Sequence, residues 1–291
     1  YRMTSLENIP VKYSDLISEI ETGQVKIPQF QRKFVWDIKS SAKLLDSIIK
    51  GYPIGTFIYW RTNERLRAVR DLGNIKLPEP KDGEYVNFVL DGQQRLTSLF
   101  ATLKGLVIAD EEGKKTDYSE MYVDFNATED QEIIITDPSK LPDNTFMKVT
   151  DLMEGSLTQL AAFPPEYHKS IENYKKIIQS YSFSVINLKN APIDVATEVF
   201  TRLNVGGKSL TLFEIMVAKT YDSKRKFDLS EKYDELKEEL TASHYDTIPS
   251  ATVLQVVSIL LEKDCTRKQI LKLEKERFID IWDEATSCIK Q

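Results

Sequence analysis

Hydrophobic and polar residues follow two different periods along the first half of the chain. Apolar residues with helical spacing over 44–49 predict an amphipathic helix that begins at Ser40 or Ser41 and stops at Gly51. Other stretches are short, continuous apolar runs bounded by polar residues, as buried strands are. The same criteria predict a helix over 14–23 capped by Ser14, an extended segment over 25–36, strands over 56–60 and 86–90, a helix over 96–103, a loop over 109–120, and a hairpin of 121–125 with 132–136.

The pattern changes after about residue 150, where helical spacing dominates. The predicted helices cover 152–160, 165–180, 195–203, 211–221, 229–241, 250–262 and 268–288. One strand over 182–188 interrupts them. The sequence therefore predicts an α+β fold, with an N-terminal region over 1–150 that holds a small mixed sheet. A mainly helical region over 151–291 packs on it.

Composition and charge narrow the function classes. The 291 residues are 41% hydrophobic and carry a formal net charge of −6. A protein that coats nucleic acid without specificity is usually basic, so DNA binding needs a local basic patch. Arg61, Arg65, Arg67 and Arg70 form such a cluster, although a solvated loop explains them more simply.

The remaining composition sets the expected compartment. Cys265 and Cys288 lack the spacing of metal ligands, and two cysteines do not make a disulfide framework. No apolar run reaches the roughly 18 residues that a membrane span needs. We therefore expect a cytoplasmic protein without a membrane association.

The strongest local signal is a polar turn between a predicted buried strand and a predicted helix. Asp91 and Gly92 follow the strand, and Gln93, Gln94 and Arg95 open the helix. Glycine permits a tight bend, the N–H groups of a helix start favour an anion, and arginine can bind phosphate oxygens in a bidentate manner. Asp91 could also cap the helix. From the residues alone, an anion-binding turn and a solvent-facing capped turn both stay open.

Four segments in order resemble one known family. The stretch FVLDGQQRLTSL at 88–99 resembles the signature of ParB/sulfiredoxin-like domains, in the version found in GmrSD, a type IV restriction system, and related phage-defence proteins. The segments at 27–36, 50–55 and 200–210 resemble its other motifs. Together the motifs span roughly residues 6–220. The resemblance implies a ParB/sulfiredoxin-like N-terminal half that binds a nucleotide.

The resemblance also implies roles for individual residues. Gly206, Lys208 and Ser209 suggest a phosphate-binding loop, but Arg202 occupies the position where that motif needs glycine. Arg202 and Asn204 instead face the nucleotide in the family, or else form a capped helix junction. Glu214 is either a partner of an arginine or a surface residue. The expected catalytic residues are Asp91, Gln94 and Arg95; the expected nucleotide-binding residues are Gln31, Arg32, Gly92, Gln93, Arg202 and Asn204; and Asp91 is the expected metal ligand.

Three functions fit these expectations. The first is a nucleoside triphosphate-binding and hydrolysing switch, with Mg²⁺, in modification-dependent restriction of phage DNA. The second is a ParB-like DNA-binding protein or nuclease that acts on DNA phosphates. The third is a scaffold that binds a nucleotide without hydrolysing it. Expected partners are a nucleotide, modified phage DNA, a separate nuclease domain or subunit, and a second copy in a homodimer.

Overall fold

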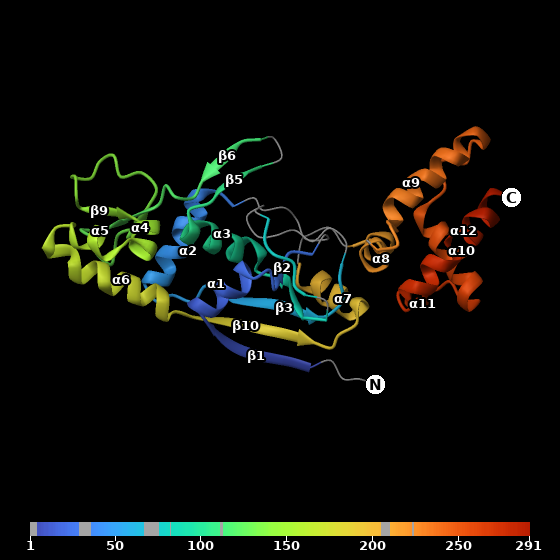
Figure 1. Ribbon diagram of the computed structural model, residues 1–291, viewed down its shortest axis with the longest axis horizontal. Coiled ribbons are helices and arrows are strands. Elements are labelled where there is room, and N and C mark those ends of the chain that lie inside the picture. Colours follow the sequence, from blue (N-terminus) through green and yellow to red (C-terminus); the bar gives the residue numbers. More distant parts are fainter. Residues whose placement is uncertain are drawn as a thin grey trace. The chain divides into compact units, whose positions relative to one another are not determined.

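The computed structural model describes residues 5–28, 36–66, 76–81, 83–110, 113–204, 210–222 and 224–291. The chain forms two compact units. The first comprises residues 1–27, 31–63 and 70–190, and the second comprises residues 28–30, 64–69 and 191–291. Figure 1 colours both along the sequence. The predicted residues Gln31, Arg32, Arg67, Arg70 and 206–209 lie outside the described residues.

The first unit is built on a five-stranded sheet with the order β1-β10-β3-β4-β2. The strands are β1 (Ser5–Lys12), β2 (Val25–Lys26), β3 (Thr56–Thr62), β4 (Val86–Asp91) and β10 (Ser182–Lys189). Two pairs are parallel, β10 with β3 and β2 with β4. The other two are antiparallel, and the β3–β4 register shifts between Ile58 and Tyr59. The sheet is therefore mixed, as the sequence predicted.

Helices α1 (Tyr13–Glu21), α2 (Ile38–Ile49) and α3 (Gln93–Lys104) lie over one face of this sheet (Figure 1). Helices α4 (Val149–Glu154), α5 (Leu157–Ala161) and α6 (His168–Ser180) lie beyond the end of the sheet, and α4 and α6 add apolar residues to the same core. Phe57 and Tyr59 of β3 and Val89 of β4 alternate onto the covered face, where they join apolar residues of α1, α2 and α3. Packing α3 in this core fixes the direction in which the chain leaves β4.

Smaller strands complete the first unit. They are β5 (Val107–Ala109), β6 (Lys115–Asp117), β7 (Tyr122–Asp124), β8 (Ile134–Ile135) and β9 (Phe146–Lys148). The predicted pairing of 121–125 with 132–136 is confirmed by the antiparallel β7–β8 pair. The predicted loop over 109–120 is wrong in part, because β5 pairs with β6. In β5 only Ile108 is buried, so this strand lacks the alternation of apolar and polar residues from which a strand is predicted.

Two predicted helix starts need correction. Helix α1 begins at Tyr13 after Lys12, so Ser14 lies inside the first turn rather than at the cap. Helix α2 begins at Ile38, and its cap is Asp37, whose carboxylate accepts a hydrogen bond of 2.7 Å from the backbone N–H of Ser40. Serine is a favoured cap residue, so Ser14 and Ser40 or Ser41 were plausible caps by residue type. The cap position, however, is set by where the backbone turns from extended to helical, which is at Lys12 and at Asp37. The predicted end of α2 at Gly51 is confirmed by its positive φ of 72°.

We expect Asp37→Ala to lower the free energy of unfolding by about 1 kcal/mol. Hydrogen bonds from the Ser40 backbone and side chain lower the pKa of Asp37. A lowered folded-state pKa adds stability above the unfolded carboxyl pKa, near 3.8, and this stability is lost as the pH falls through the folded-state value. Urea unfolding between roughly pH 2 and pH 7 tests this pH dependence. Asp37→Asn should keep most of the cap without its acid dependence, and equal pH profiles for all three proteins would contradict the assignment.

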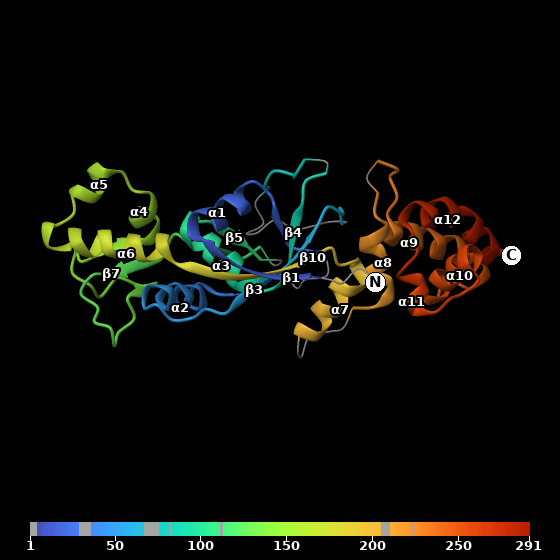
Figure 2. The ribbon, with the colours of Figure 1, turned by 90° about the horizontal axis from the view of Figure 1, so that it is seen from below.

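The boundary between the two compact units lies near residue 190 rather than near 150. Ile171 and Ile178 of α6 belong to the first core, and β10 pairs with β1 and β3 inside the sheet. Figure 2 shows β10 continuing from α6 into the sheet. The change of residue pattern at 150 therefore marks a change of secondary structure, whereas tertiary pairing places the next 40 residues in the first unit.

The second unit is helical in the residues that the structure describes. Its helices are α7 (Ile193–Leu203), α8 (Leu212–Thr220), α9 (Leu229–Leu240), α10 (Ser250–Glu262), α11 (Arg267–Ile270) and α12 (Lys275–Lys290). A separate core joins apolar residues of α8, α9, α10 and α12 around Phe278 and Trp282. The α+β class is thus confirmed. Across the described part of the chain, no helix combines the length and apolar character that crossing a membrane requires.

Candidate functional site

The polar turn lies where the sequence placed it, between a buried strand and a buried helix. Residues 86–90 of β4 are buried, and Asp91 ends the strand with its side chain 44% exposed. Helix α3 begins at Gln93, and its first backbone hydrogen bond runs from the N–H of Leu96 to the carbonyl of Gly92 over 2.9 Å. The helix cap is therefore Gly92, and the expectation that Asp91 caps the helix is wrong.

Glycine is required at position 92 because of its backbone conformation and because no room is left for a side chain. Its φ of 91° and ψ of 10° lie in the left-handed region, which costs a residue with a side chain about 1–2 kcal/mol. A Cβ atom at this position would lie 2.5 Å from Cδ1 of Phe57 and 3.2 Å from Nη2 of Arg95. Glycine also leaves the start of α3 without a capping side chain, so the first-turn N–H groups have no partner from residue 92.

Arg95 folds back from the first turn of α3 and binds the neighbouring strand. Its Nη1 donates to the carbonyl of Ile54 over 2.7 Å, and its Nη2 donates to the carbonyl of Thr56 over 3.0 Å. Nη2 also donates to Oδ2 of Asp91 over 3.1 Å. The guanidinium lies 5.3 Å from the centroid of the Phe57 ring, within the range of a cation–π contact. These contacts hold a cation beside the start of α3.

The contacts of Arg95 limit how it can bind phosphate. A guanidinium presents a bidentate fork through Nη1 and Nη2 or through Nε and Nη2. Both protons of Nη2 are already donated, to Thr56 and to Asp91. A bidentate grip on an oxyanion therefore needs one of these bonds to break, and the bond to the half-exposed Asp91 is the more accessible one.

The segment before β3 contributes Gly55, which was not among the expected site residues. Gly55 has a φ of 87°, and a Cβ atom there would lie 2.4 Å from Nη1 of Arg95. Gly55 also separates Ile54 and Thr56, whose carbonyls accept from Arg95. The signal was present, because 50–55 is one of the four motif segments. Its physical role is to make room for the arginine of the motif at 88–99.

Gln93 and Gln94 are buried rather than directed into solvent. They are 6% and 7% exposed, and Nε2 of Gln94 donates to Oε1 of Gln93 over 2.8 Å. Nearby, the hydroxyl of Ser98 donates to the hydroxyl of Ser41 over 2.5 Å, which joins α3 to α2. These contacts make the start of α3 a fixed, packed platform. Direct chemistry by Gln94 stays a prediction.

Among the described residues, the other predicted side chains, those of Arg202, Asn204 and Glu214, belong to the second unit. Arg202 lies in the last turn of α7, where its Nε donates to Oε1 of Glu198 over 2.8 Å. Asn204 ends that helix, and its N–H donates to the carbonyl of Phe200 over 3.0 Å. Glu214 forms a capping box with Thr211 at the start of α8, so it stabilises a helix end. The structure brings Asp91, Gly92 and Arg95 together, while a nucleotide contact by Arg202 or Asn204 stays a prediction.

The turn offers one carboxylate to a metal ion. In the described residues, no group of three histidine, cysteine, aspartate or glutamate side chains is arranged to hold a metal. Mg²⁺ needs only one or two carboxylates when phosphates and water supply its other ligands. Asp91 alone therefore fits a nucleotide-borne Mg²⁺ and does not fit a metal held by protein ligands only.

Comparison with known proteins identifies a family. The model of the family described as GmrSD restriction endonuclease, N-terminal domain, matches residues 13–221. This range is well over half of the chain and contains the turn at 91–95 as well as Arg202 and Asn204. An uncharacterized protein from Methanocaldococcus jannaschii is 38% identical over 95 residues. That alignment covers 30% of this chain and 16% of the relative.

Proposed function

Because this chain belongs to the family of GmrSD restriction endonuclease N-terminal domains, we propose that it binds a nucleoside triphosphate at the turn 91–95 and hydrolyses it to control DNA restriction. The observation that carries the proposal is the start of α3. There a helix start whose cap residue has no side chain and the guanidinium of Arg95 lie beside the half-exposed carboxylate of Asp91. Helix N-termini attract phosphate through their N–H groups and dipole.

The Asp91–Arg95 ion pair suggests how the turn receives its ligand. A phosphate at the start of α3 competes with Asp91 for Nη2 of Arg95, which is 3.1 Å from Oδ2. The arginine then keeps its bonds to the carbonyls of Ile54 and Thr56 and needs little reorganisation. The released carboxylate of Asp91 becomes available to a Mg²⁺ ion that accompanies the phosphates, or to a water molecule. Arg95 thereby stabilises charge that develops on the phosphate during hydrolysis.

In this proposal, hydrolysis controls the DNA restriction that a nuclease domain or subunit carries out. A ligand biases a conformational equilibrium by its difference in affinity for the two states. Breaking and remaking the Asp91–Arg95 pair gives the two nucleotide states different contacts in the first unit. The partners in this proposal are a nuclease domain or subunit and modified phage DNA, with a second copy of the chain as a further partner. Gln31, Arg32, Arg202 and Asn204 are the proposed additional nucleotide ligands.

Nucleotide binding is tested by thermal unfolding with each of the four ribonucleoside triphosphates, with and without Mg²⁺. A ligand at 100 times its Kd stabilises the native state by about 2.7 kcal/mol. We expect stabilisation by at least one triphosphate, and a larger effect with Mg²⁺. If none of the four stabilises the protein under either condition, the nucleotide assignment is wrong.

Hydrolysis is tested by phosphate release from the intact chain and from three variants. Asp91→Asn and Arg95→Lys should each reduce release by about a hundredfold or more, as loss of one charge-stabilising group does in other enzymes. Asp130→Asn removes an exposed carboxylate elsewhere in the first unit and should have no effect. Equal release by all four proteins would refute the catalytic roles. Stabilisation without any release would instead favour the nucleotide-gated scaffold.

A further inference from the structure

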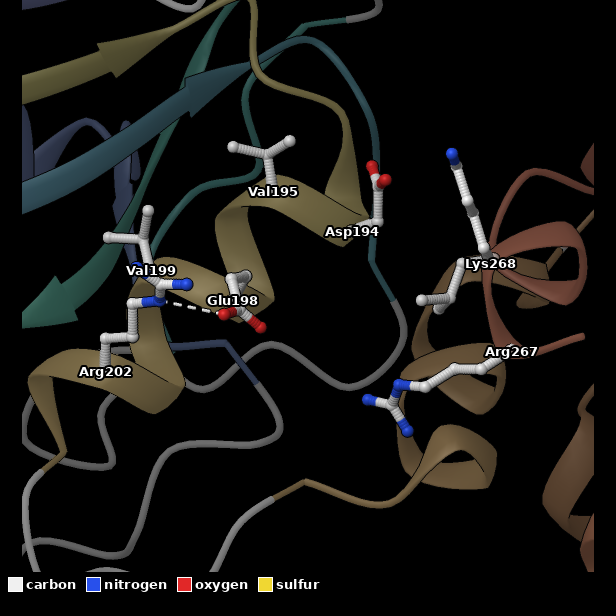
Figure 3. A pocket seen from close by; sticks show the side chains of 8 residues that line it. Asp194, Val195, Glu198, Val199, Arg202, Arg267 and Lys268 are labelled. Carbon is white, nitrogen blue, oxygen red and sulfur yellow. Dashed lines mark hydrogen bonds and ion pairs between the residues drawn. The ribbon is translucent and has the colours of Figure 1, made fainter.

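A groove lies in the second unit, between α7 and α11 (Figure 3). It has a volume of about 520 Å³ and is open to solvent. One wall consists of α7 side chains, and the other consists of α11 side chains together with the residue that follows that helix. The lining residues are Asp194, Val195, Glu198, Val199, Arg202, Arg267, Lys268 and Leu271.

The floor of the groove is apolar. Val195 and Val199 are spaced by one helical turn on α7 and are half-buried, and Leu271 is half-buried on the opposite wall. Apolar atoms make up most of the exposed lining. Two apolar side chains at i and i+4 form the stripe on which another helix can pack. The floor therefore offers burial to apolar side chains of an occupant.

The charges of the groove differ between its two walls. Glu198 is paired with Arg202 over 2.8 Å, as the dashed line in Figure 3 shows, and Asp194 interacts electrostatically with Lys219. Arg267 and Lys268 are exposed, and neither has an ion-pair partner among the residues that the structure describes. The guanidinium of Arg267 extends from α11 into the space between the helices (Figure 3). The uncompensated charge is thus positive and lies on the α11 wall.

We propose that this groove is a docking site for an acidic amphipathic helix of a partner protein. Its apolar side chains would pack on Val195, Val199 and Leu271, and carboxylates on its flank would pair with Arg267 and Lys268. Charge complementarity selects this occupant. The uncompensated positive charge lies on the α11 wall only, and the carboxylates of Asp194 and Glu198 lie on the α7 wall. A helix can direct its acidic flank toward the α11 wall alone, whereas a nucleic-acid backbone carries negative charge along its whole length. The open shape also suits a macromolecular segment better than an enclosed small molecule.

Docking at this groove requires neither the turn at 91–95 nor a bound nucleotide. The family match ends at residue 221, so the α11 wall lies beyond the matched segment. Arg202 also lines the groove, where it pairs with Glu198, but the charges assigned to the docking site are those of Arg267 and Lys268, so docking is compatible with the nucleotide contact proposed for Arg202. The docking site is therefore formed by α7, which lies within the matched segment, and by α11, which follows it.

The proposal is tested with the full chain and three fluorescein-labelled probes. Two are synthetic helices with the same leucine stripe, one with glutamates and the other with lysines on the polar face, and the third is an oligothymidine. Fluorescence anisotropy measures their dissociation constants. We expect the glutamate helix to bind at least about tenfold more tightly than the lysine helix, a difference of about 1.4 kcal/mol.

Variants of both walls locate the binding. Arg267→Glu combined with Lys268→Glu, and separately Val199→Asp, should weaken binding of the glutamate helix about tenfold. Lys272→Glu makes the same kind of charge change on an exposed residue outside the groove and should leave binding unchanged. Equal binding of both helices, no binding of either, or insensitivity to the groove variants would overturn the proposal. Tighter binding of oligothymidine that is lost on charge reversal would overturn it in favour of nucleic acid.

Discussion

Gly92→Ala is expected to lower the free energy of unfolding of the first unit by about 3 kcal/mol. The left-handed backbone accounts for about 1–2 kcal/mol of this cost. The remainder comes from overlap of the new Cβ with the Phe57 ring, 2.5 Å away, and overpacking of this kind costs about 1–3 kcal/mol. Phe57 is buried in the core and cannot move away freely.

The matched control for Gly92→Ala is Gly51→Ala. Gly51 also has a positive φ, of 72°, but nothing lies within 4 Å of a Cβ built on it. Its substitution should therefore cost only the conformational part. Urea unfolding followed by tryptophan fluorescence measures both, in a Trp282→Phe background where Trp36 and Trp60 report on the first unit. Equal losses for the two glycines would show that Phe57 yields to the methyl group.

Arg95→Ala is expected to cost a similar amount, about 3 kcal/mol. The substitution removes hydrogen bonds from a charged donor to two carbonyls and to Asp91, and a hydrogen bond that involves a charged group contributes about 1.5–3 kcal/mol. The side chain is 21% exposed, so water compensates part of the loss. Arg95→Lys keeps the charge but lacks the guanidinium fork, so its free energy of unfolding should lie between those of the native protein and Arg95→Ala. Urea unfolding in the same background provides the measurement.

A double-mutant cycle then tests the contact between Gly55 and Arg95. In the native background, Gly55→Ala should cost about 1–2 kcal/mol more than Gly83→Ala, which has the same φ of 87° but open space around it. In the Arg95→Ala background, Nη1 is absent, and the two glycine substitutions should cost the same. An extra cost at Gly55 that persists without Arg95 would mean that the glycine serves another neighbour.

Gly55→Ala and Asp91→Asn together separate stability from function at the turn. Gly55→Ala leaves the chemistry of Asp91 and Arg95 intact and disturbs only the position of the guanidinium. Asp91→Asn leaves that position largely intact and removes the carboxylate. If triphosphate binding depends on the pre-positioned arginine, Gly55→Ala should weaken binding and also destabilise the first unit. Asp91→Asn should weaken only the part of the binding that depends on Mg²⁺, and it should change the stability of the first unit much less.

Much of the local structure could be predicted from the residues alone. The helical spacing around Leu44 to Ile49 and the buried run before Asp91 both depend on neighbours within a few positions, and such signals are legible in one sequence. The edge strand β1 was not predicted. Leu6 of that strand is 70% exposed, and the strand is held by pairing with β10, about 175 residues later. A partner at that distance leaves no trace in the local pattern.

For the turn at 91–95, too, some features follow from the local sequence and others only from tertiary contacts. The sequence by itself determined that a glycine and an arginine follow a buried strand at the start of a helix, because composition and period are local properties. Only the tertiary structure decided what Arg95 contacts, since the carbonyls of Ile54 and Thr56 reach it through the pairing of β3 with β4. It also decided that Gly55 makes room for the guanidinium, and that Arg267 and Lys268 face α7 across a groove. Such contacts arise from packing between distant segments, and no spacing along the chain encodes them.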